Sequence, residues 1–460
     1  MSAPDERMQQ QHADDGADDD EPRLTADDID EVIDDTRGDE PMEEDDSGPD
    51  DDEEAEGEGA AAQQQQQQPD GETFEDTSIA AFYSHRKSLF ALALHPNFAQ
   101  TGLALSGGED DGAWIWHTHD GADVARLDGH TDSVTAVAWS ADGTLAASGG
   151  MDGRVRVWAQ PQQGAAWALV QSLEGPDEVV WLAWHPKGNV LVAGASDSTV
   201  WMWQLPSGNV MNVFSGHTAA VTAGRWTPDG KKLVTVSEDG TLIVWDPRSG
   251  SPLGKLQNGD ARFHFDAGIT ALAVSTDSRV LLVGGAEGDV RVVNIGSLDA
   301  GGAPAVVGEL RGHASGESIE AAEFVDLLGA GPAAAPTHAI TASTEGKAVV
   351  WDLASGKMRC EIMHDAAITT LSLHTGSPLF TTASADHTAR TWDARTGALI
   401  ATHKGFTDGI LALAVGPDDG YTQGAETGGI GAYQTAQAGQ RKGFKVVCAG
   451  DEGVALVFRV

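Results

Sequence analysis

Short runs in which apolar and polar residues alternate recur from about residue 77 to the end of the chain. Residues 134–139, 145–148 and 155–158 are three such runs, and turn-forming pairs such as Asp142-Gly143 separate runs of this kind. Alternation with a period of two predicts strands that bury one face, and Asp-Gly pairs are typical of tight turns between antiparallel strands. The pattern therefore predicts an all-β domain built of short antiparallel strands.

A longer unit contains these strands and repeats along the chain. Its markers are a Gly-His pair near the start, an Asp in a turn and a Trp at the end. Three units keep the same spacing between these markers: His130, Asp152 and Trp158; His217, Asp239 and Trp245; and His364, Asp386 and Trp392. A unit of about 40 to 45 residues with such markers is typical of a β-propeller blade.

The chain holds eight such units if the weaker copies are included. They end at Trp116, Trp158, Trp203, Trp245, Val293, Trp351, Trp392 and Phe458. Three copies depart from the pattern: the third has Pro176 and Ala193 in place of His and Ser, the fifth offers Glu287 and Val293, and the eighth keeps Asp451 with Phe458. We predict eight blades, because omitting one copy would leave an alternating stretch unplaced; seven blades with one unit as a side element is the alternative.

Residues 77–83 are expected to close the ring. If the repeats are out of step with the blades, the first strand completes the last blade, so this segment should pair with residues 450–460 and remove an open sheet edge. The propeller would then span residues 77–460. Residues 295–304, 326–336 and 416–443 are interpreted as loops inserted between strands.

Charge separates residues 1–76 from the rest of the chain. They hold 31 acidic and 3 basic residues, a net charge of −28, and include a glutamine run at residues 63–68. Such a segment cannot bury enough apolar surface to offset its ordering entropy, so we predict a disordered acidic low-complexity tail. Within it, residues 24–33 would place apolar side chains on one helix face; a helix formed on contact with a partner and a transient helix in a solvated tail both fit this pattern.

The composition argues against several classes of function. The whole chain carries a net charge of −43, which disfavours direct binding of nucleic acid through phosphates and favours a basic partner. Cys360 and Cys448 are too few for a disulfide framework, and we expect them to be buried in a protein of a reducing compartment. Because no secretory signal or membrane-spanning apolar run is recognisable, we expect a soluble protein of the cytoplasm, with the nucleus as a second location.

The histidines suggest catalysis as a possible function, but their recurrence in unit after unit argues against it. Residues such as His85 and His130 lie near Ser and Asp residues, as in a catalytic triad, but a catalytic group should occur once and these recur unit by unit. The sequence contains no nucleotide-binding loop, nucleophile elbow or metal-ligand motif. We therefore expect no enzyme activity, no metal and no cofactor.

With these residues the chain resembles the WD40-repeat proteins over residues 77–460. The resemblance implies four-stranded blades around a central channel, and in each complete unit a buried hydrogen-bond chain of His, Ser or Thr, Asp and Trp. The complete sets are His85, Ser106, Asp110 and Trp116; His130, Ser148, Asp152 and Trp158; His217, Thr235, Asp239 and Trp245; and His364, Thr382, Asp386 and Trp392. The sixth unit keeps His313, Thr341 and Trp351, with Glu345 in place of Asp.

A closer resemblance is to the family of the angio-associated migratory cell protein and its fungal relatives. It rests on the acidic start of the chain and on Ser-Gly-Gly-Glu-Asp-Asp at 106–111, Val-Trp-Met-Trp at 200–203, Glu-Asp-Gly-Thr-Leu-Ile-Val-Trp-Asp at 238–246 and Trp-Asp-Ala-Arg-Thr-Gly at 392–397; the last two are near-generic for WD40 repeats. The resemblance implies a monomeric chaperone that captures the basic N-terminal segment of a nascent large-subunit ribosomal protein during ribosome assembly.

The WD40 resemblance also implies that partners bind on the upper face, which carries the turn Asp residues. The residue before each turn Asp and the first residues of each inner strand line this face. The candidate residues are Glu109, Asp111, Asp132, Glu178, Trp181, Glu238, Glu317, Glu320 and Asp408. Trp181 is included because its alternation with Leu182 and Trp184 would aim it at the channel mouth. The alternative for the acidic members is a solvated surface without a partner.

Two other kinds of partner remain open at this stage. A signalling scaffold, or the substrate receptor of a ubiquitin ligase, would use the same propeller; a helical adaptor-binding motif would favour it, and residues 24–33 are the candidate. A histone-binding propeller would also suit an acidic face. A Lys/Arg cluster for nuclear targeting would favour that function, and the sequence lacks one.

Overall fold

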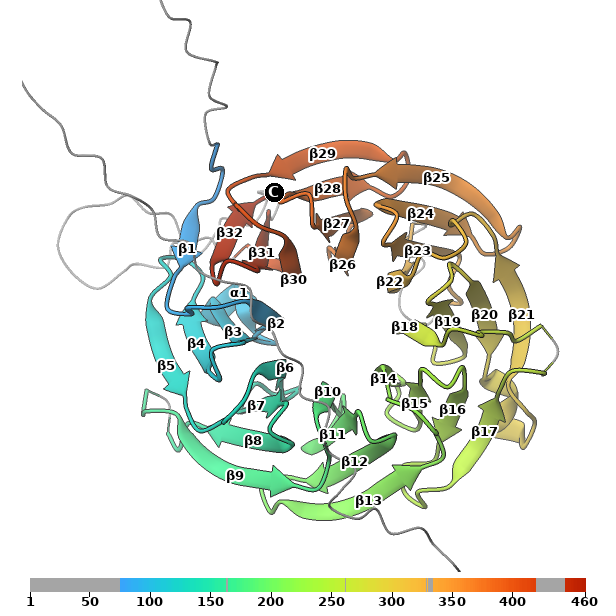
Figure 1. Ribbon diagram of the computed structural model, residues 1–460, viewed down its shortest axis with the longest axis horizontal. Coiled ribbons are helices and arrows are strands. Elements are labelled where there is room, and N and C mark those ends of the chain that lie inside the picture. Colours follow the sequence, from blue (N-terminus) through green and yellow to red (C-terminus); the bar gives the residue numbers. More distant parts are fainter. Residues whose placement is uncertain (1–74, 163, 261, 328, 330–333, 419–442) are drawn as a thin grey trace, which may run out of the picture. The chain divides into compact units, whose positions relative to one another are not determined.

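The structure is a computed structural model that describes residues 75–162, 164–260, 262–327, 329, 334–418 and 443–460. It contains eight antiparallel sheets of four strands each, arranged as the blades of a ring (Figure 1). The prediction of an all-β propeller with eight blades is confirmed. The expected acidic tail up to residue 74, with the helix candidate at residues 24–33, lies outside the described residues, as does most of the 416–443 insertion.

The blades are numbered in chain order, each from its inner to its outer strand. Blade 1 holds β2 (Leu89–Leu94), β3 (Leu103–Gly108), β4 (Ala113–His117) and β5 (Asp123–Leu127); blade 2 holds β6 (Val134–Trp139), β7 (Leu145–Gly150), β8 (Arg154–Ala159) and β9 (Ala168–Glu174). Blade 3 holds β10 (Val179–Trp184), β11 (Val190–Ala195), β12 (Thr199–Gln204) and β13 (Asn209–Ser215); blade 4 holds β14 (Ala223–Trp226), β15 (Leu233–Val236), β16 (Leu242–Trp245) and β17 (Pro252–Leu256).

The second half of the ring follows the same order. Blade 5 holds β18 (Ile269–Val274), β19 (Val280–Gly285), β20 (Val290–Asn294) and β21 (Ala305–Leu310); blade 6 holds β22 (Ile319–Val325), β23 (His338–Ser343), β24 (Lys347–Asp352) and β25 (Lys357–Met363). Blade 7 holds β26 (Ile368–Leu373), β27 (Leu379–Ser384), β28 (Ala389–Asp393) and β29 (Ala398–His403); blade 8 holds β30 (Ile410–Pro417), β31 (Phe444–Gly450), β32 (Ala455–Arg459) and β1 (Ala80–Phe82). The helical segments are α1 (Phe98–Thr101) and the 3-10 helix η1 (Gly296–Ala300). No helix in the described part of the chain is long and apolar enough to cross a membrane.

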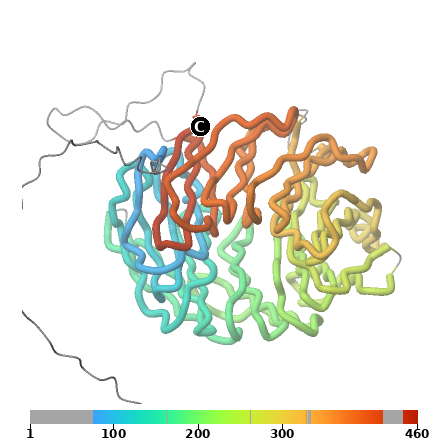
Figure 2. The backbone as a smooth tube through the Cα atoms, turned by 45° about the horizontal axis from the view of Figure 1, so that its top comes forward, coloured from blue at the N-terminus to red at the C-terminus, as the bar shows by residue number. Residues whose placement is uncertain are grey.

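The core lies between neighbouring blades. The inner strands pack against one another in chain order, and β30 packs against β2, so the ring of blades is continuous (Figures 1 and 2). Trp116, Trp203, Trp245 and Trp351 stand on the third strands of their blades and are at most 2% exposed. An indole at this repeated position buries a large apolar area between two sheets, which explains why Trp recurs there. Cys448 is buried as expected, whereas Cys360 is half-buried.

Both ends of the described chain meet in blade 8. β1 pairs antiparallel with β32, with Ala80 opposite Val457, and is shorter than the segment 77–83. Phe82 is fully buried and stacks on Trp116 of blade 1, with 4.6 Å between the ring centroids. β1 therefore covers the edge of β32 and also ties blade 8 to blade 1.

Candidate functional site

The upper face is the end of the ring at which the inner strands begin. In each blade it is formed by the loop that enters the inner strand and by the turn between the second and third strands. One backbone hydrogen bond joins turn to loop in every blade, from the N–H of the residue before the turn acid to the carbonyl of the last loop residue. The pairs are Glu109 to Ser88 (2.9 Å), Met151 to Ser133 (2.9 Å), Ser196 to Glu178 (3.0 Å), Glu238 to Ala220 (3.1 Å), Ala286 to Gly268 (3.2 Å), Thr344 to Ser318 (3.0 Å), Ala385 to Ala367 (2.9 Å) and Asp451 to Gly409 (2.9 Å).

The residue that follows each donor is acidic in all eight blades. These turn acids are Asp110, Asp152, Asp197, Asp239, Glu287, Glu345, Asp386 and Glu452. The sequence-based choice of Asp451 as the turn acid of the eighth unit is therefore wrong. Asp451 takes the place of Glu109, while the carboxylate of Glu452 accepts a hydrogen bond from the Thr407 N–H at 2.8 Å. Two adjacent acids in one glycine-flanked turn make this register ambiguous in the sequence.

Hydrogen bonds connect the His, Ser or Thr, Asp and Trp sets. In blade 1, His85 Nδ1 lies 2.9 Å from Asp110 Oδ1 and His85 Nε2 lies 2.9 Å from Ser106 Oγ, to which Trp116 Nε1 donates at 3.2 Å. Blades 2 and 7 repeat this arrangement with His130, Ser148, Asp152 and Trp158, and with His364, Thr382, Asp386 and Trp392. In blade 6, Glu345 replaces Asp and its Oε1 lies 2.9 Å from the Nδ1 of the histidine.

Blade 4 carries the set in a modified form. His217 Nε2 lies 2.7 Å from Thr235 Oγ1, and Trp245 Nε1 donates to that oxygen at 2.8 Å. On the other side, His217 Nδ1 lies 2.7 Å from Thr241 Oγ1, which donates to Asp239 Oδ1 at 2.6 Å. The direct distance from His217 Nδ1 to Asp239 Oδ1 is 3.6 Å. Thr241 is thus an additional member that the sequence pattern did not indicate.

Burial disfavours the protonated form of three of these histidines. It lowers the pKa of His130 and of His313, and it lowers the pKa of His217 to about 4. In the neutral ring of His130, Nδ1 carries the proton because it faces a carboxylate, and Nε2 accepts from the hydroxyl of Ser148. No lone pair is left to act as a base, so the sets are structural braces of the turns. Within the described residues, no group of three or more His, Cys, Asp or Glu is placed to hold a metal ion.

Phenylalanine rings replace the histidine in two of the incomplete units. A Cβ on Gly450 of blade 8 would lie 2.7 Å from the ring of Phe406, as one on Gly150 of blade 2 would lie 2.9 Å from His130 Nδ1. Phe265 has the same place in blade 5. An apolar ring fills the space without leaving a half-satisfied polar network. Phe406 follows Gly405 as His130 follows Gly129, whereas a longer loop before Phe265 hid its equivalence in the sequence.

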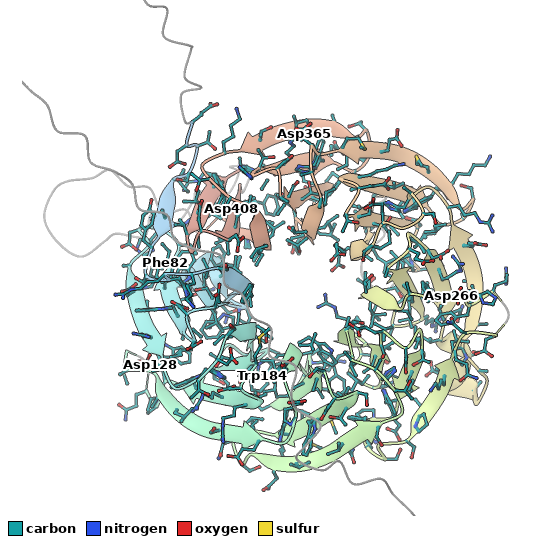
Figure 3. All side chains as sticks on the ribbon, viewed as in Figure 1. Phe82, Asp128, Trp184, Asp266, Asp365 and Asp408 are labelled. Atoms are coloured by element: carbon teal, nitrogen blue, oxygen red, sulfur yellow. The ribbon has the colours of Figure 1, made fainter. Side chains whose placement is uncertain are left out.

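The nine candidate residues occupy three kinds of position. Turns between second and third strands carry Glu109, Asp111 and Glu238; loops that enter inner strands carry Asp132, Glu178, Glu317 and Asp408; inner strands carry Trp181 and Glu320. Figure 3 labels Asp408 beside β30. The backbone hydrogen bonds between turns and loops therefore bring the acidic candidates to one end of the ring.

The acidic candidates differ in their partners. Six of them are exposed, and in the described structure none of these six has a Lys or Arg within ion-pair distance: Asp111, Asp132, Glu178, Glu238, Glu320 and Asp408. The other two are engaged. Glu109 Oε1 lies 3.3 Å from Lys87 Nζ, and Glu317 Oε2 accepts a hydrogen bond from Thr344 Oγ1 at 2.7 Å.

Three further carboxylates share these positions and were missed. Asp177 occupies the loop position of Asp132, Glu287 is a turn acid, and Asp451 has the position of Glu109. All three are exposed, and the described part of the chain places no Lys or Arg within ion-pair distance of them. Aligning the units on the turn-to-loop hydrogen bond shows that these residues share the positions of the other candidates, whereas the His, Asp and Trp pattern identified Glu287 only as a marker of its unit.

Trp181 packs between blades 3 and 4. It stands opposite Gly194 in the pairing of β10 with β11, and its Nε1 donates to the Val221 carbonyl at 2.9 Å. A Cβ on Gly224 of β14 would lie 2.0 Å from its ring. The expectation that Trp181 points at the channel mouth is thereby corrected, because the indole fills the contact between two blades.

Comparison with known proteins was consistent with this architecture. The chain matches the family described as WD domain, G-beta repeat, at residues 121–159, 167–204, 208–246 and 358–393. It is 31% identical over 350 residues to the angio-associated migratory cell protein of Homo sapiens, which covers 75% of this chain and 76% of that protein. It is 31% identical over 113 residues to the ribosome assembly protein SQT1 of Saccharomyces cerevisiae, covering 24% of this chain and 26% of that one.

A solved structure is similar along the whole propeller. The crystal structure of Chaetomium thermophilum Sqt1 bound to the N-terminus of the ribosomal protein L10 has a TM-score of 0.70 and 28% sequence identity to this chain. The match covers 84% of this chain and 100% of Sqt1.

Proposed function

Because the chain belongs to the angio-associated migratory cell protein family of WD40-repeat proteins, we propose that it is a non-enzymatic chaperone for ribosome assembly. Its partner in this proposal is the basic N-terminal segment of a newly made large-subunit ribosomal protein, held on the upper face. The single observation that carries this proposal is a set of carboxylates on that face for which the described residues provide no Lys or Arg within ion-pair distance. They are Asp111, Asp132, Asp177, Glu178, Glu238, Glu287, Glu320, Asp408 and Asp451.

Several basic residues near this face are already engaged with other carboxylates. On third strands, Arg154 pairs with Glu174, Arg291 with Asp289 and Arg390 with Asp365; in the loops that enter inner strands, Arg311 pairs with Glu309 and Lys404 with Glu75. Carboxylates gathered at one end of a ring produce a negative electrostatic potential there, which attracts cations. A segment rich in Lys and Arg is the complementary ligand.

The chemistry of the partner supports the same proposal. A ribosomal protein that has not yet met its RNA carries uncompensated Lys and Arg side chains, and charge-assisted hydrogen bonds to several carboxylates would hold such a segment. The similarity to Sqt1, which was crystallised with the N-terminus of the ribosomal protein L10, favours a peptide of this kind over a histone or a ubiquitin-ligase substrate. In this proposal the protein acts as a monomer without direct contact to nucleic acid, in the cytoplasm and also in the nucleus.

Charge reversal on the upper face tests the proposal. The probe is a synthetic peptide with the N-terminal sequence of the ribosomal protein L10, titrated into the full chain by calorimetry. We expect Glu238→Lys and Glu320→Lys each to weaken binding about tenfold or more, because a charge-assisted contact becomes a repulsion. The affinity of the unaltered protein should fall as salt is added.

A matched control makes the same change in net charge elsewhere. Glu361 stands on the outer strand β25 with its side chain 54% exposed, and Glu361→Lys should leave the affinity unchanged. If all three variants bound the peptide as tightly as the unaltered protein, or if all three lost the same affinity, the upper face would be excluded as the binding site. Failure of the unaltered protein to bind the peptide at all would overturn the proposed function.

A further inference from the structure

The inner rim of the upper face is formed by one residue from each blade, the one that follows the first buried residue of the inner strand. The eight rim residues are Phe90, Thr135, Val180, Thr222, Thr270, Glu320, Thr369 and Leu411. Because neighbouring inner strands pack against one another, rim residues of successive blades are neighbours around the ring.

Threonine at the rim ties four of the eight blades to the next one. The hydroxyl donates to the carbonyl of the first buried residue of the following inner strand: Thr135 to Val179, Thr222 to Ile269 at 2.6 Å, Thr270 to Ile319 at 2.7 Å, and Thr369 to Ile410 at 2.6 Å. In blade 3, where the rim residue is Val180, the Nε1 of Trp181 supplies the corresponding bond to Val221. A side-chain hydrogen bond to the next blade is thus the usual arrangement near this position.

Phe90 and Leu411 are apolar exceptions to this pattern in adjacent blades; Val180 and Glu320 are the other rim residues that are not threonine. Phe90 and Leu411 stand on β2 of blade 1 and β30 of blade 8, which pack side by side, and neither side chain can donate a hydrogen bond. Phe90 is 38% exposed, and Leu411 is partly exposed. Replacing a tying hydroxyl by an apolar group gives up a hydrogen bond between blades and leaves apolar surface in water, so stability does not explain the choice.

Carboxylates surround this apolar pair. Glu109 accepts a hydrogen bond from the hydroxyl of Ser88, two residues before Phe90, at 3.3 Å. On the side of Leu411, the Asp451 N–H donates to the Gly409 carbonyl, and Asp408 Oδ1 accepts from the Gly409 N–H at 2.8 Å. Glu109 is also paired with Lys87, at 3.3 Å from its Nζ, whereas Asp408 and Asp451 have no Lys or Arg within ion-pair distance among the described residues. The surface therefore combines an apolar centre with anionic groups on the side of Leu411.

We infer that the basic segment held on the upper face places one large apolar side chain against Phe90 and Leu411. Lys or Arg residues beside that side chain pair with Asp408 and Asp451. The inference rests on the proposed function and adds the pattern of the ligand: basic residues interrupted by a single large apolar one. In this arrangement the charges attract the segment to the upper face, and the apolar contact determines its position along that face.

Two synthetic peptides of equal charge test the inference with the full chain. Both alternate lysine and glycine; one carries a central phenylalanine, and the other carries glycine at that place. We expect the unaltered protein to bind the first about tenfold more tightly, because burying a large apolar side chain contributes about that much to affinity. Phe90→Thr and Leu411→Thr, which install the rim residue of four other blades, should reduce this preference and leave the affinity for the all-glycine peptide unchanged.

Val210→Thr is the matched control, since Val210 is 49% exposed on the outer strand β13. It should preserve the preference. If the unaltered protein binds both peptides equally, or if Phe90→Thr keeps the full preference, the apolar contact is excluded while the proposed function stands. If the unaltered protein binds neither peptide, the inference falls together with the proposed function. Unchanged melting temperatures would show that the variants fold.

Discussion

The indole of Trp181 occupies the space that the absent side chain of Gly224 leaves in the next blade. The residues equivalent to Gly224 are Leu92, Val137, Leu182, Leu272, Ala322, Leu371 and Leu413, so every other blade has a side chain there. The position of Trp181 is Ala or Thr in the other blades. At the junction of blades 3 and 4, the large side chain is therefore supplied by Trp181 of blade 3, and the position that carries a side chain in the other blades is occupied by Gly224 of blade 4.

This arrangement predicts a strongly non-additive pair of mutations. Trp181→Ala should lower the free energy of unfolding by about 2–4 kcal/mol, because it opens a cavity between blades 3 and 4. Gly224→Leu should also destabilise, since its side chain would collide with the indole. The double variant restores the arrangement of the other junctions and should lose less than the sum of the single changes, as measured by urea denaturation. Strict additivity would contradict the pairing.

The brace of blade 2 predicts the cost of losing one hydroxyl. Ser148 Oγ lies 2.9 Å from His130 Nε2 and accepts from Trp158 Nε1 at 3.4 Å. Ser148→Ala should lower the free energy of unfolding by about 1–3 kcal/mol, because two buried polar atoms lose their partner at once. Ser172→Ala on the exposed outer strand β9 is the control and should change stability little. A similar small effect for both substitutions in denaturant titrations would argue against the brace.

The strand that closes the ring predicts a contrast between two neighbouring aromatic residues. Phe82 is 0% exposed and stacks on Trp116, whereas Tyr83 is 69% exposed. Phe82→Ala should cost about 3–5 kcal/mol of unfolding free energy, and Tyr83→Ala less than about 0.5 kcal/mol. Figure 3 labels Phe82 beside blade 1. If Phe82→Ala were as stable as the unaltered protein in thermal melts, β1 would not be holding blades 8 and 1 together.

A second buried polar chain crosses blade 7. His374 Nε2 lies 2.8 Å from Thr381 Oγ1, Thr381 Oγ1 lies 2.8 Å from Thr391 Oγ1, and Thr391 Oγ1 lies 3.0 Å from His403 Nε2. Burial lowers the pKa of each histidine to about 4. Two hydroxyl protons serve three hydrogen bonds, so one histidine must donate and the other must accept, and protonation of the accepting ring breaks the chain.

Stability should therefore fall with acid over a defined range. The unfolded chain takes up these two protons near pH 6.5 and the folded chain near pH 4, so their contribution is fully present above pH 6.5 and is lost as the pH falls toward 4. Each histidine should cost about 2 kcal/mol of unfolding free energy between about pH 7 and pH 5. His374→Phe should flatten this dependence, while His264→Phe, at an exposed site, should leave it intact. An unaltered slope in His374→Phe would contradict the assignment.

The repeating residue types made the blade count predictable. Each complete blade forms its own brace, which requires His, Asp and Trp at a fixed spacing. The same pattern therefore occurs several times in the sequence. Where a blade substitutes an apolar ring, as with Phe265 and Phe406, the histidine signal is lost, and the packing of the ring against the turn glycine identifies its place. The register error at Asp451 has the same origin, because two acids compete for one turn position.

The candidate site was predictable by position and less so by residue. Local order along a turn determines which residues reach the upper face, and most acidic candidates follow from it. Trp181 was misjudged because its environment depends on Gly224, a residue of another blade that no local pattern connects to it. The rim residues Phe90 and Leu411 were missed for a related reason: they are unusual only in comparison with the threonines at the equivalent positions of other blades.

The pairing of β1 with β32 also governs when the protein can fold. Ala80 pairs with Val457, so its strand leaves the ribosome without a partner and stays unpaired until residue 457 has been synthesised. Contacts between such distant residues form late and slowly, because a long loop must close before they contribute any stability. The ring is consequently completed only after β32 has been made, and a product in which synthesis stopped earlier would expose unpaired edges on which strands of other molecules can add.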